Sequence, residues 1–371
     1  MGKTPGSDVP VFFDHAAGEA PRPEIAARYA ELAARLRYNP HGLTCYSEEC
    51  RRALLQAECE LLTAAGVPQD EAQVVWCASG TEALNLALRG YCWRRRDGVI
   101  AADAAAHPAL RNTAADLGHA VEYFLPTRTS RLPAAEMVAL SLVNNETGAV
   151  WPGRGGAFPD GALLLVDAAQ ALGRMALPWR TEAIDMLVLS GRKIGGPASA
   201  AALVLRRSTV PALRAVVTGG GQQHGWRSGT VDVVSAVLFA EAARLAEAER
   251  ATVTARVTSL NRQLRTGIME RGAGRWPVFS PDNGSPYILA FAIPGCEGAL
   301  VTRILAADYG IVVGAGSACS AESGEVSPAL SAEGTPEALA RGMIRVSFSG
   351  SNTPQEVSAL LEALEAVRKN Y

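Results

Sequence analysis

The chain has 371 residues, of which 48% are hydrophobic and 19% are charged, and its net charge is −2. This balance indicates a folded protein with a large core and excludes a disordered chain, which combines low hydrophobicity with high net charge. It gives no basis for nucleic-acid binding, which needs an excess of basic residues. No apolar run of about 18 residues and no secretory leader are visible, so we expect a cytoplasmic protein without membrane contact.

The first two thirds of the chain predict an α/β domain. Residues 21–37 and 49–65 have the apolar spacing of helices. From about 73 to 207, short apolar runs alternate with helical stretches, a pattern typical of a mainly parallel sheet. The expected strands are 74–76, 99–101, 121–124, 138–143, 162–166, 186–189 and 202–205, and the helices between the early ones are 81–92 and 108–117.

The rest of the chain predicts a small α+β domain. A long Ala-rich helix over 231–271 would link it to the first domain. The elements expected after this helix are strands at 287–293, 311–313 and 343–348 and helices at 297–307 and 354–369. We therefore expect an N-terminal segment over 1–20, a large domain over 21–250 and a small domain over 251–371, with which the N-terminal segment can pack.

Lysine is rare in this chain, and its distribution singles out one residue. Of the 35 Lys and Arg residues, only Lys3, Lys193 and Lys369 are lysine, and two of these lie near the chain ends. A guanidinium stays protonated and cannot replace an amine that acts as a nucleophile, so Lys193 indicates amine chemistry. It follows an expected strand, beside Ser190 and Arg192, which could hold phosphate. A lysine there can form a Schiff base with an aldehyde cofactor, and a chance surface lysine is the alternative.

Two further motifs lie at the carboxyl ends of expected strands, where parallel sheets bind ligands. Ser79, Gly80 and Thr81 open a helix, whose N–H groups and dipole suit a phosphate. A capped helix start without a ligand is the alternative. Asp167 ends an apolar run and could pair with a protonated ring nitrogen or a ribose hydroxyl, and the alternatives are a metal ligand or an N-cap. The Gly-rich segment 219–230 matches neither common nucleotide-binding pattern.

The cysteines predict free thiols. Their number is odd, and their spacing matches no zinc pattern, so no metal site is expected. Most should be small buried hydrophobic residues. Cys319 is the exception, because it lies in a segment of Gly, Ser and Ala that suits an exposed nucleophile. The seven cysteines are Cys45, Cys50, Cys59, Cys77, Cys92, Cys296 and Cys319.

The order of these motifs resembles that of the cysteine desulfurases, from about Phe13 to the C-terminus. The motifs are Ser-Gly-Thr-Glu, Val-Asn-Asn-Glu-Thr-Gly, Val-Asp-Ala-Ala-Gln, Ser-Gly-x-Lys, Arg-Ser-Gly-Thr and Gly-Ser-Ala-Cys. The cysteine desulfurases are class V, fold-type I enzymes that depend on pyridoxal 5'-phosphate (PLP). The resemblance implies a large domain with a mainly parallel seven-stranded sheet and a small α+β C-terminal domain.

The resemblance also implies residues that hold the cofactor. Lys193 would form the Schiff base, and Asp167 would pair with the pyridinium nitrogen. Gln170 would hydrogen-bond the phenolic oxygen, and His107 would stack on the ring and take part in proton transfer. The residues implied at the phosphate are Ser79, Gly80, Thr81, Ser190 and Arg192, with Thr230 at the site of the neighbouring subunit. A homodimer with shared active sites follows.

The substrate implied is an amino acid. Asn39, Asn145 and Arg345 would bind it, with Arg345 holding the α-carboxylate by a bidentate pair. Cys319 would attack the sulfur and carry it as a persulfide, from which a sulfur-acceptor protein could receive it.

The chain departs from the family pattern in four places, which bear on the substrate and the sulfur acceptor. Arg192 replaces the usual His, 196–199 lacks Lys-Gly, 14–18 lacks Asn and Thr-Thr, and 125–160 is short. The leading hypothesis is cleavage of L-cysteine to alanine. One alternative is a C–S lyase that acts by β-elimination on an S-substituted cysteine in small-molecule biosynthesis. The other is a non-catalytic sulfur carrier or scaffold, against which the set Lys193, Asp167, His107 and Arg345 argues.

Overall fold

The computed structural model describes residues 10–93, 98–129, 131–132, 134–155, 158–209, 213–316 and 326–370. The chain forms two compact units. Unit 1 consists of Met1–Gly18, Val143–Val150 and Ala251–Tyr371, and unit 2 of Glu19–Leu142 and Trp151–Arg250. Helix α5 (Val233–Arg271) contributes to both units. Within the described ranges, no helix is long and apolar enough to cross a membrane.

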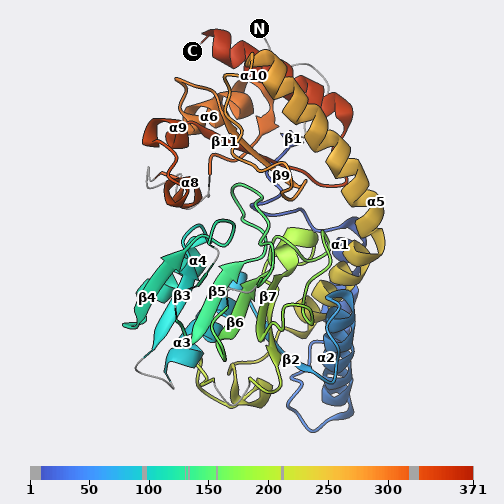
Figure 1. Cartoon of the computed structure of the whole chain (residues 1–371). Helices are drawn as coiled ribbons and strands as arrows, with labels where there is room; N and C mark the ends of the chain where they lie inside the picture. The colour runs from blue at the N-terminus through green and yellow to red at the C-terminus, as the bar shows by residue number, and fades with distance from the viewer. Residues whose placement is uncertain are drawn as a thin grey trace. The chain divides into compact units, whose positions relative to one another are not determined.

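Unit 2 is built on a seven-stranded sheet with the order β2-β8-β7-β6-β5-β3-β4 (Figure 1). Its strands are β2 (Ala72–Cys77), β3 (Val99–Asp103), β4 (Ala120–Phe124), β5 (Met137–Ser141), β6 (Leu163–Asp167), β7 (Met186–Ser190) and β8 (Ala201–Arg206). β8 is antiparallel to both of its neighbours, and the pairs from β7 to β4 are parallel. The mainly parallel seven-stranded sheet is therefore confirmed, and six strands end at one edge of it.

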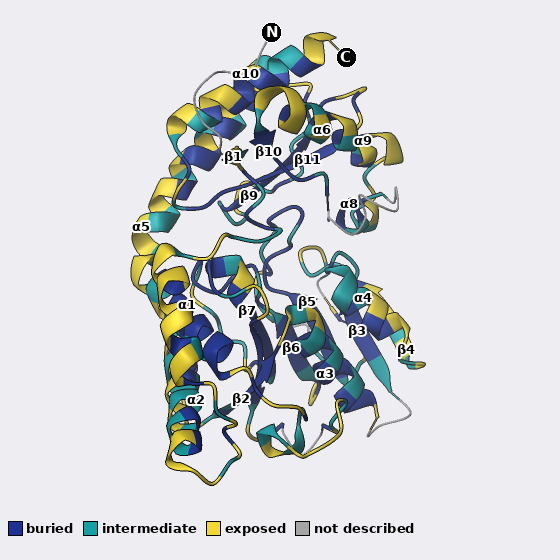
Figure 2. Cartoon of the chain, turned by 180° about the vertical axis from the view of Figure 1, so that it is seen from behind, coloured by how far each residue is buried: buried dark blue, intermediate teal, exposed yellow. Residues whose placement is uncertain are grey.

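Helices cover both faces of this sheet. α3 (Gly80–Cys92) and α4 (Pro108–Ala115) pack on one face in an apolar cluster. On the other face, Trp76 of β2 meets Phe239 of α5 edge to face, with ring centroids 6.3 Å apart. Strands β5 and β7 are buried along their whole length (Figure 2), which accounts for apolar sequences without alternation. Helices α1 (Pro23–Arg35) and α2 (Cys45–Ala64) complete the unit.

Unit 1 has two short sheets around its own core. β9 (Ile288–Ala292) and β11 (Met343–Ser347) are antiparallel, and β1 (Val11–Phe12) and β10 (Ile311–Val312) are parallel. The second half of α5, α6 (Gly298–Tyr309) and α10 (Pro354–Asn370) supply apolar side chains to the core. Two short helices, α8 (Pro328–Ala332) and α9 (Glu337–Arg341), and strand β1 are not predicted from sequence, because two to five residues carry no periodicity.

Residues 143–150 belong to unit 1 although unit 2 surrounds them in sequence. The side chain of Asn144 folds this segment by accepting the N–H groups of Glu146 and Thr147, both at 2.9 Å. The carbonyl of Gly148 accepts the N–H of Ser285 at 2.8 Å. Gly148 has φ of +71°, and a Cβ there would lie 3.1 Å from the Cβ of Ile288, so only glycine fits this turn against β9.

Candidate active site

Three of the residues predicted from sequence meet at the carboxyl edge of the unit 2 sheet. Asp167 ends β6, and the neighbouring strand β7 leads into a short 3₁₀ turn, Gly191–Ile194, which carries Lys193. Burial raises the pKa of Asp167, and the N–H of Ala169 at 3.0 Å and the charges of His107 and Lys193 oppose this shift. The structure therefore brings Asp167, His107 and Lys193 into one electrostatic cluster.

His107 is fixed by its position at the start of α4. Its Nδ1 accepts the backbone N–H of Ala109 at 3.1 Å, which caps the helix. Because Nδ1 acts as the acceptor, the neutral ring carries its proton on Nε2. The ring is thus oriented by the backbone, with a defined proton position.

The start of α3 lies beside strand β7 of the same sheet. Ser79 caps the helix by accepting the N–H of Glu82 at 3.1 Å, and Glu82 accepts the N–H of Ala78 at 2.6 Å. A Cβ on Gly80 would lie 3.8 Å from the side chain of Val188 in β7, so the helix start passes close to that strand. Ser79 and Thr81 are exposed. This geometry leaves a helix N-terminus accessible to an anion.

Gln170 is connected to the lysine by a residue that sequence reasoning missed. Its Oε1 accepts Nη1 of the buried Arg174 at 2.6 Å, and Nη2 of Arg174 donates to the carbonyl of Lys193 at 2.8 Å. The only sequence signal is the spacing of four residues between Gln170 and Arg174. That signal is weak in a chain where nearly every cation is arginine.

The other predicted site residues of unit 2 differ in their exposure. Ser190 is buried at the end of β7, whereas Arg192 is exposed and its guanidinium makes no hydrogen bond to the described residues. Thr230 is exposed and lines a cavity of about 150 Å³ together with Ala78. Asn39 is exposed, and its Oδ1 accepts the N–H of His41 at 2.9 Å. Their functional roles stay predictions.

Unit 1 contains a separate group around Arg345, which lies in β11 and is 2% exposed. Its Nη2 contacts Asp14 Oδ1 at 2.6 Å, and its Nη1 donates to the carbonyl of Asn145 at 3.0 Å. Its Nε is buried and has no hydrogen-bond partner among the described residues. A Cβ at Gly314 would lie 2.9 Å from both Arg345 Nη2 and Asp14 Oδ1, so glycine allows the backbone to approach this ion pair closely. Arg345 therefore already has one carboxylate partner, Asp14, and its role towards a substrate stays a prediction.

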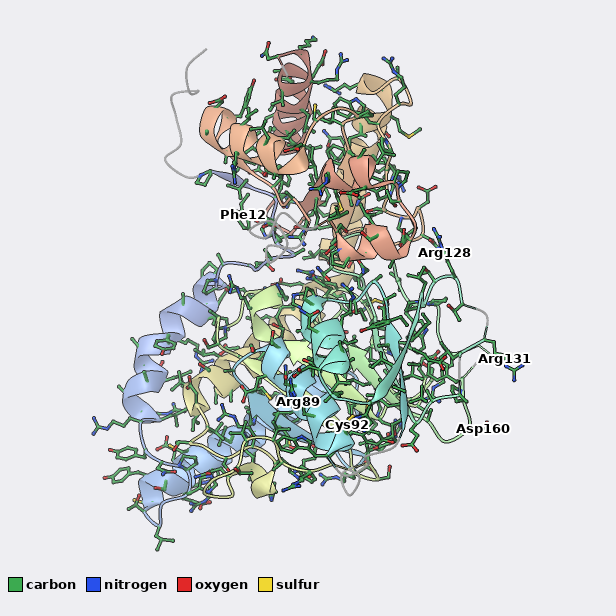
Figure 3. All side chains as sticks on the ribbon, turned by 90° about the vertical axis from the view of Figure 1, so that its left-hand side faces the viewer. Phe12, Arg89, Cys92, Arg128, Arg131 and Asp160 are labelled. Carbon is green, nitrogen blue, oxygen red and sulfur yellow. The ribbon has the colours of Figure 1, made fainter. Side chains whose placement is uncertain are left out.

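The cysteines mostly follow the expectation of buried free thiols. Cys50, Cys77, Cys92 and Cys296 are buried, Cys59 is half-buried and Cys45 is exposed. Burial raises the pKa of Cys77 and raises that of Cys92, at the end of α3 (Figure 3), to about 11, so neither thiol is reactive near neutral pH. Cys319, the predicted nucleophile, lies outside the described residues.

A second acidic residue, Asp103, lies close to Asp167. It ends β3 and accepts the N–H groups of Ala105 at 2.8 Å and Ser141 at 3.3 Å. Burial, together with the charge of Asp167, raises the pKa of Asp103 from 3.8 to about 6. Sequence reasoning missed it, although it shares the signal of Asp167, an acidic residue at the end of an apolar strand.

This shift predicts a pH-dependent stability. Because the folded protein holds the proton of Asp103 more tightly than the unfolded chain, the charged carboxylate costs stability as the pH rises from about 4 to about 6. Asp103→Asn removes this titration. In cofactor-free protein, the free energy of unfolding of Asp103→Asn, relative to that of wild type, should therefore be roughly 1–3 kcal/mol higher at pH 7 than at pH 4. Urea titrations at the two pH values measure this change.

The matched control is Asp160→Asn, which alters an exposed carboxylate of the same unit (Figure 3). It should follow wild type at both pH values. A constant difference between Asp103→Asn and wild type across this range would contradict the assignment.

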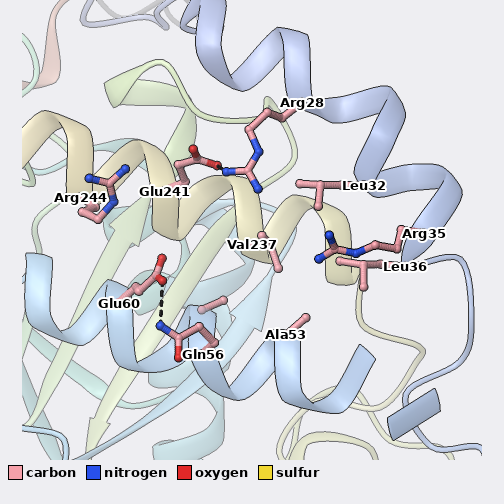
Figure 4. A pocket seen from close by; sticks show the side chains of 11 residues that line it. Arg28, Leu32, Arg35, Leu36, Ala53, Gln56, Glu60, Val237, Glu241 and Arg244 are labelled. Carbon is pink, nitrogen blue, oxygen red and sulfur yellow. Dashed lines mark hydrogen bonds and ion pairs between the residues drawn. The ribbon is translucent and has the colours of Figure 1, made fainter. Parts of the chain in front are cut away.

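A cavity of about 300 Å³ lies elsewhere in unit 2, between α1, α2 and α5 (Figure 4). Three arginines line it, but Glu241 pairs with Arg28 at 2.6 Å, and Glu60 adds a further carboxylate. None of the residues predicted for the site lines this cavity. The cavity is therefore separate from the cluster at the carboxyl edge of the sheet.

Comparison with known proteins identifies the family. Residues 11–360 match the family model described as aminotransferase class-V. The chain belongs to this family. A relative described as a cysteine desulfurase, from Gluconacetobacter diazotrophicus, is 31% identical over 347 residues, which cover 89% of this chain and 86% of the relative. The resemblance to cysteine desulfurases indicated by the motifs is thereby confirmed.

Two solved structures share the fold of this chain. A NifS-like protein superposes with a TM-score of 0.84 and 23% identity, covering 98% of this chain and 100% of the other. The apo structure of a cysteine desulfurase from Thermococcus onnurineus NA1 gives a TM-score of 0.82 and 22% identity, covering 98% and 95%. These likenesses support the fold-type I architecture that the motifs imply.

Proposed function

We propose that this class-V protein is a PLP-dependent cysteine desulfurase, which converts L-cysteine to alanine and leaves the sulfur as a persulfide on Cys319. The observation that carries the proposal is the cluster of Lys193, Asp167 and His107 at the carboxyl edge of the sheet. The similarity to relatives described as cysteine desulfurases supports it. We further propose that unit 2 is the cofactor-binding domain and unit 1 the small domain.

The groups present in unit 2 fit PLP. Lys193 offers an amine for its aldehyde, half-buried Asp167 offers a carboxylate for its ring nitrogen, and the N-terminus of α3 offers donors for its phosphate. The phosphate would be held by Ser79, Gly80, Thr81, Ser190 and Arg192. When bound, the cofactor supplies an electron sink that stabilises negative charge on the substrate.

The chain's own residues prepare this chemistry. Asp167 is costly to ionise alone, because burial raises its pKa, so a cationic ring nitrogen is the partner that stabilises its charge. Gln170 would hold the phenolic oxygen through its amide. His107, oriented by Ala109, presents a proton at Nε2 and is placed to hold or move it.

Arg345 would bind the substrate carboxylate, with Asn39 and Asn145 as further substrate contacts. Asp14 and the carbonyl of Asn145 hold the guanidinium, and its Nε remains without a partner among the described residues. In the reaction, the C–S bond of cysteine breaks, the Cys319 thiolate receives the sulfur as a persulfide, and a proton replaces the sulfur on the substrate carbon. This transfer of sulfur needs no external oxidant.

Product analysis tests the proposal. The protein reconstituted with PLP is incubated with L-cysteine and a thiol reductant, and alanine, sulfide, pyruvate and ammonia are measured. Alanine and sulfide in equal amounts are the expected products. Pyruvate and ammonia would instead indicate a C–S lyase, and no turnover of cysteine or its S-conjugates would indicate a carrier or scaffold.

Arg345→Lys should weaken substrate binding. Lysine keeps the charge but loses the fixed fork of donors, so KM for cysteine should rise by roughly 10–100-fold, the effect of a lost charged hydrogen bond. Steady-state kinetics measure it. Arg341→Lys, which alters an exposed arginine of unit 1 that pairs with Glu337, serves as control. Equal KM values for Arg345→Lys and wild type would remove Arg345 from the substrate site.

The assembly is also part of the proposal. We expect a homodimer in which Thr230 reaches the phosphate site of the neighbouring subunit, and a cytoplasmic sulfur-acceptor protein that takes the persulfide sulfur. Its support is the motif resemblance, and an equilibrium sedimentation measurement together with persulfide transfer assays tests it.

A further inference from the structure

In the lysine turn, defined as residues 191–196, each backbone carbonyl from Gly191 to Gly195 accepts at least one hydrogen bond. The carbonyl of Gly191 accepts the N–H groups of Gly195 and, at 2.9 Å, Gly196. The N–H of Glu19 donates to the carbonyl of Arg192 at 2.9 Å. This dense bonding fixes the backbone from which the side chain of Lys193 projects.

Arg22 and Arg174 donate the hydrogen bonds to the other three carbonyls of the turn. Arg22 donates its Nε to the carbonyl of Ile194 at 3.1 Å and its backbone N–H to that of Gly195 at 2.8 Å. Arg174 donates to the carbonyl of Lys193 itself at 2.8 Å. Arg174 is 8% exposed, and a buried guanidinium forms stronger hydrogen bonds than one in water.

Arg174 also determines how the amide of Gln170 is oriented. A guanidinium only donates, so the group 2.6 Å from its Nη1 must be the amide oxygen of Gln170. The N–H₂ end of the amide therefore points away from Arg174. An amide in this orientation offers a donor, which is the group that a phenolate oxygen requires.

We propose that Arg174 is a positioning residue, which holds the backbone of Lys193 and fixes the donor orientation of Gln170 with one buried guanidinium. The inference rests on the proposed function in one respect only, the cofactor contact of Gln170. The contacts of Arg174 with the lysine turn stand independently of any cofactor.

The first test uses cofactor-free protein and hydrogen–deuterium exchange. Arg174→Met removes both hydrogen bonds but keeps an apolar stem of similar length, so exchange in the lysine turn should become about tenfold faster or more. Arg256→Met is the matched control, because Arg256 also donates to a backbone carbonyl, that of Asn352, but in unit 1. Unchanged exchange of the lysine turn in Arg174→Met would overturn the proposal.

The second test reads the orientation of Gln170 in the PLP-loaded protein. A donor on the phenolic oxygen favours its negatively charged form, so loss of the donor should raise the pH midpoint of the visible absorption by about one unit in Arg174→Met. In a Gln170→Ala background, the same change at Arg174 should produce no further shift. Shifts of equal size in both backgrounds would overturn the role through Gln170.

The two tests also separate this inference from the proposed function. If wild type fails to bind PLP, the proposed function fails, while exchange in cofactor-free protein still decides whether Arg174 holds the lysine turn. If Arg174→Met does not fold, Arg174→Lys is measured in the same way. Its single ammonium cannot reproduce the forked contact with Gln170 and Lys193, so partial loss of protection and a smaller shift are expected, and wild-type values for both would overturn the proposal.

Discussion

Lys193→Ala is expected to abolish the visible absorption of the PLP-loaded protein and to reduce alanine formation by a factor on the order of 10³ or more. Lys193 is the only lysine in the sequence that does not lie near a chain end. Arginine cannot replace its amine because a guanidinium does not lose its proton. Absorption spectra after reconstitution and a kinetic assay with L-cysteine measure both effects.

The composition offers an unusually simple control for this change. Lys369→Ala alters an exposed lysine of α10, which pairs with Glu365, and should leave both readouts unchanged. An unaltered absorption band in Lys193→Ala would show that PLP is held through another group and would remove the basis of the proposed function.

Cys319→Ser is expected to retain the PLP spectrum and to lose persulfide and alanine formation almost completely. Sulfur transfer needs a thiolate, and a hydroxyl at the same position cannot accept the sulfur. Binding of PLP and of the amino acid does not involve this thiol, so the spectral change on addition of cysteine should persist. Persulfide labelling and alanine measurement on the same sample separate the two steps.

Cys45→Ser is the control, because Cys45 is an exposed thiol among the described residues and lies in α2. It should form alanine at the wild-type rate. If Cys319→Ser consumed cysteine at the wild-type rate, the reaction would need no protein thiol there, and β-elimination would become the better description.

The α/β sheet could be predicted because its physical cause is local. Strands such as β5 and β7 are buried on both faces, so an uninterrupted apolar run is itself the signal. The two-residue strand β1 carries no such signal, and its pairing with β10 depends on residues 300 positions away in the chain. Short elements of this kind are stabilised by tertiary contacts rather than by their own sequence.

The candidate site was predictable only in part, for a similar reason. Lys193 and Asp167 stand out by residue type and by position after a strand. The pairing of Arg345 with Asp14 joins residues 331 positions apart, and no spacing encodes it. Arg174 has no compositional contrast in an arginine-rich chain, and its role becomes visible only through its two hydrogen bonds.

A single-turnover experiment tests directly whether the sulfur of cysteine is transferred to Cys319. PLP-loaded protein reacts with L-cysteine without reductant, alanine is quantified, and the added sulfur is located by peptide mass. If Cys319 receives the sulfur, alanine and protein-bound sulfur form in equal amounts, and the sulfur is on the peptide containing Cys319. Pyruvate in place of alanine, or alanine without sulfur on that peptide, would contradict it.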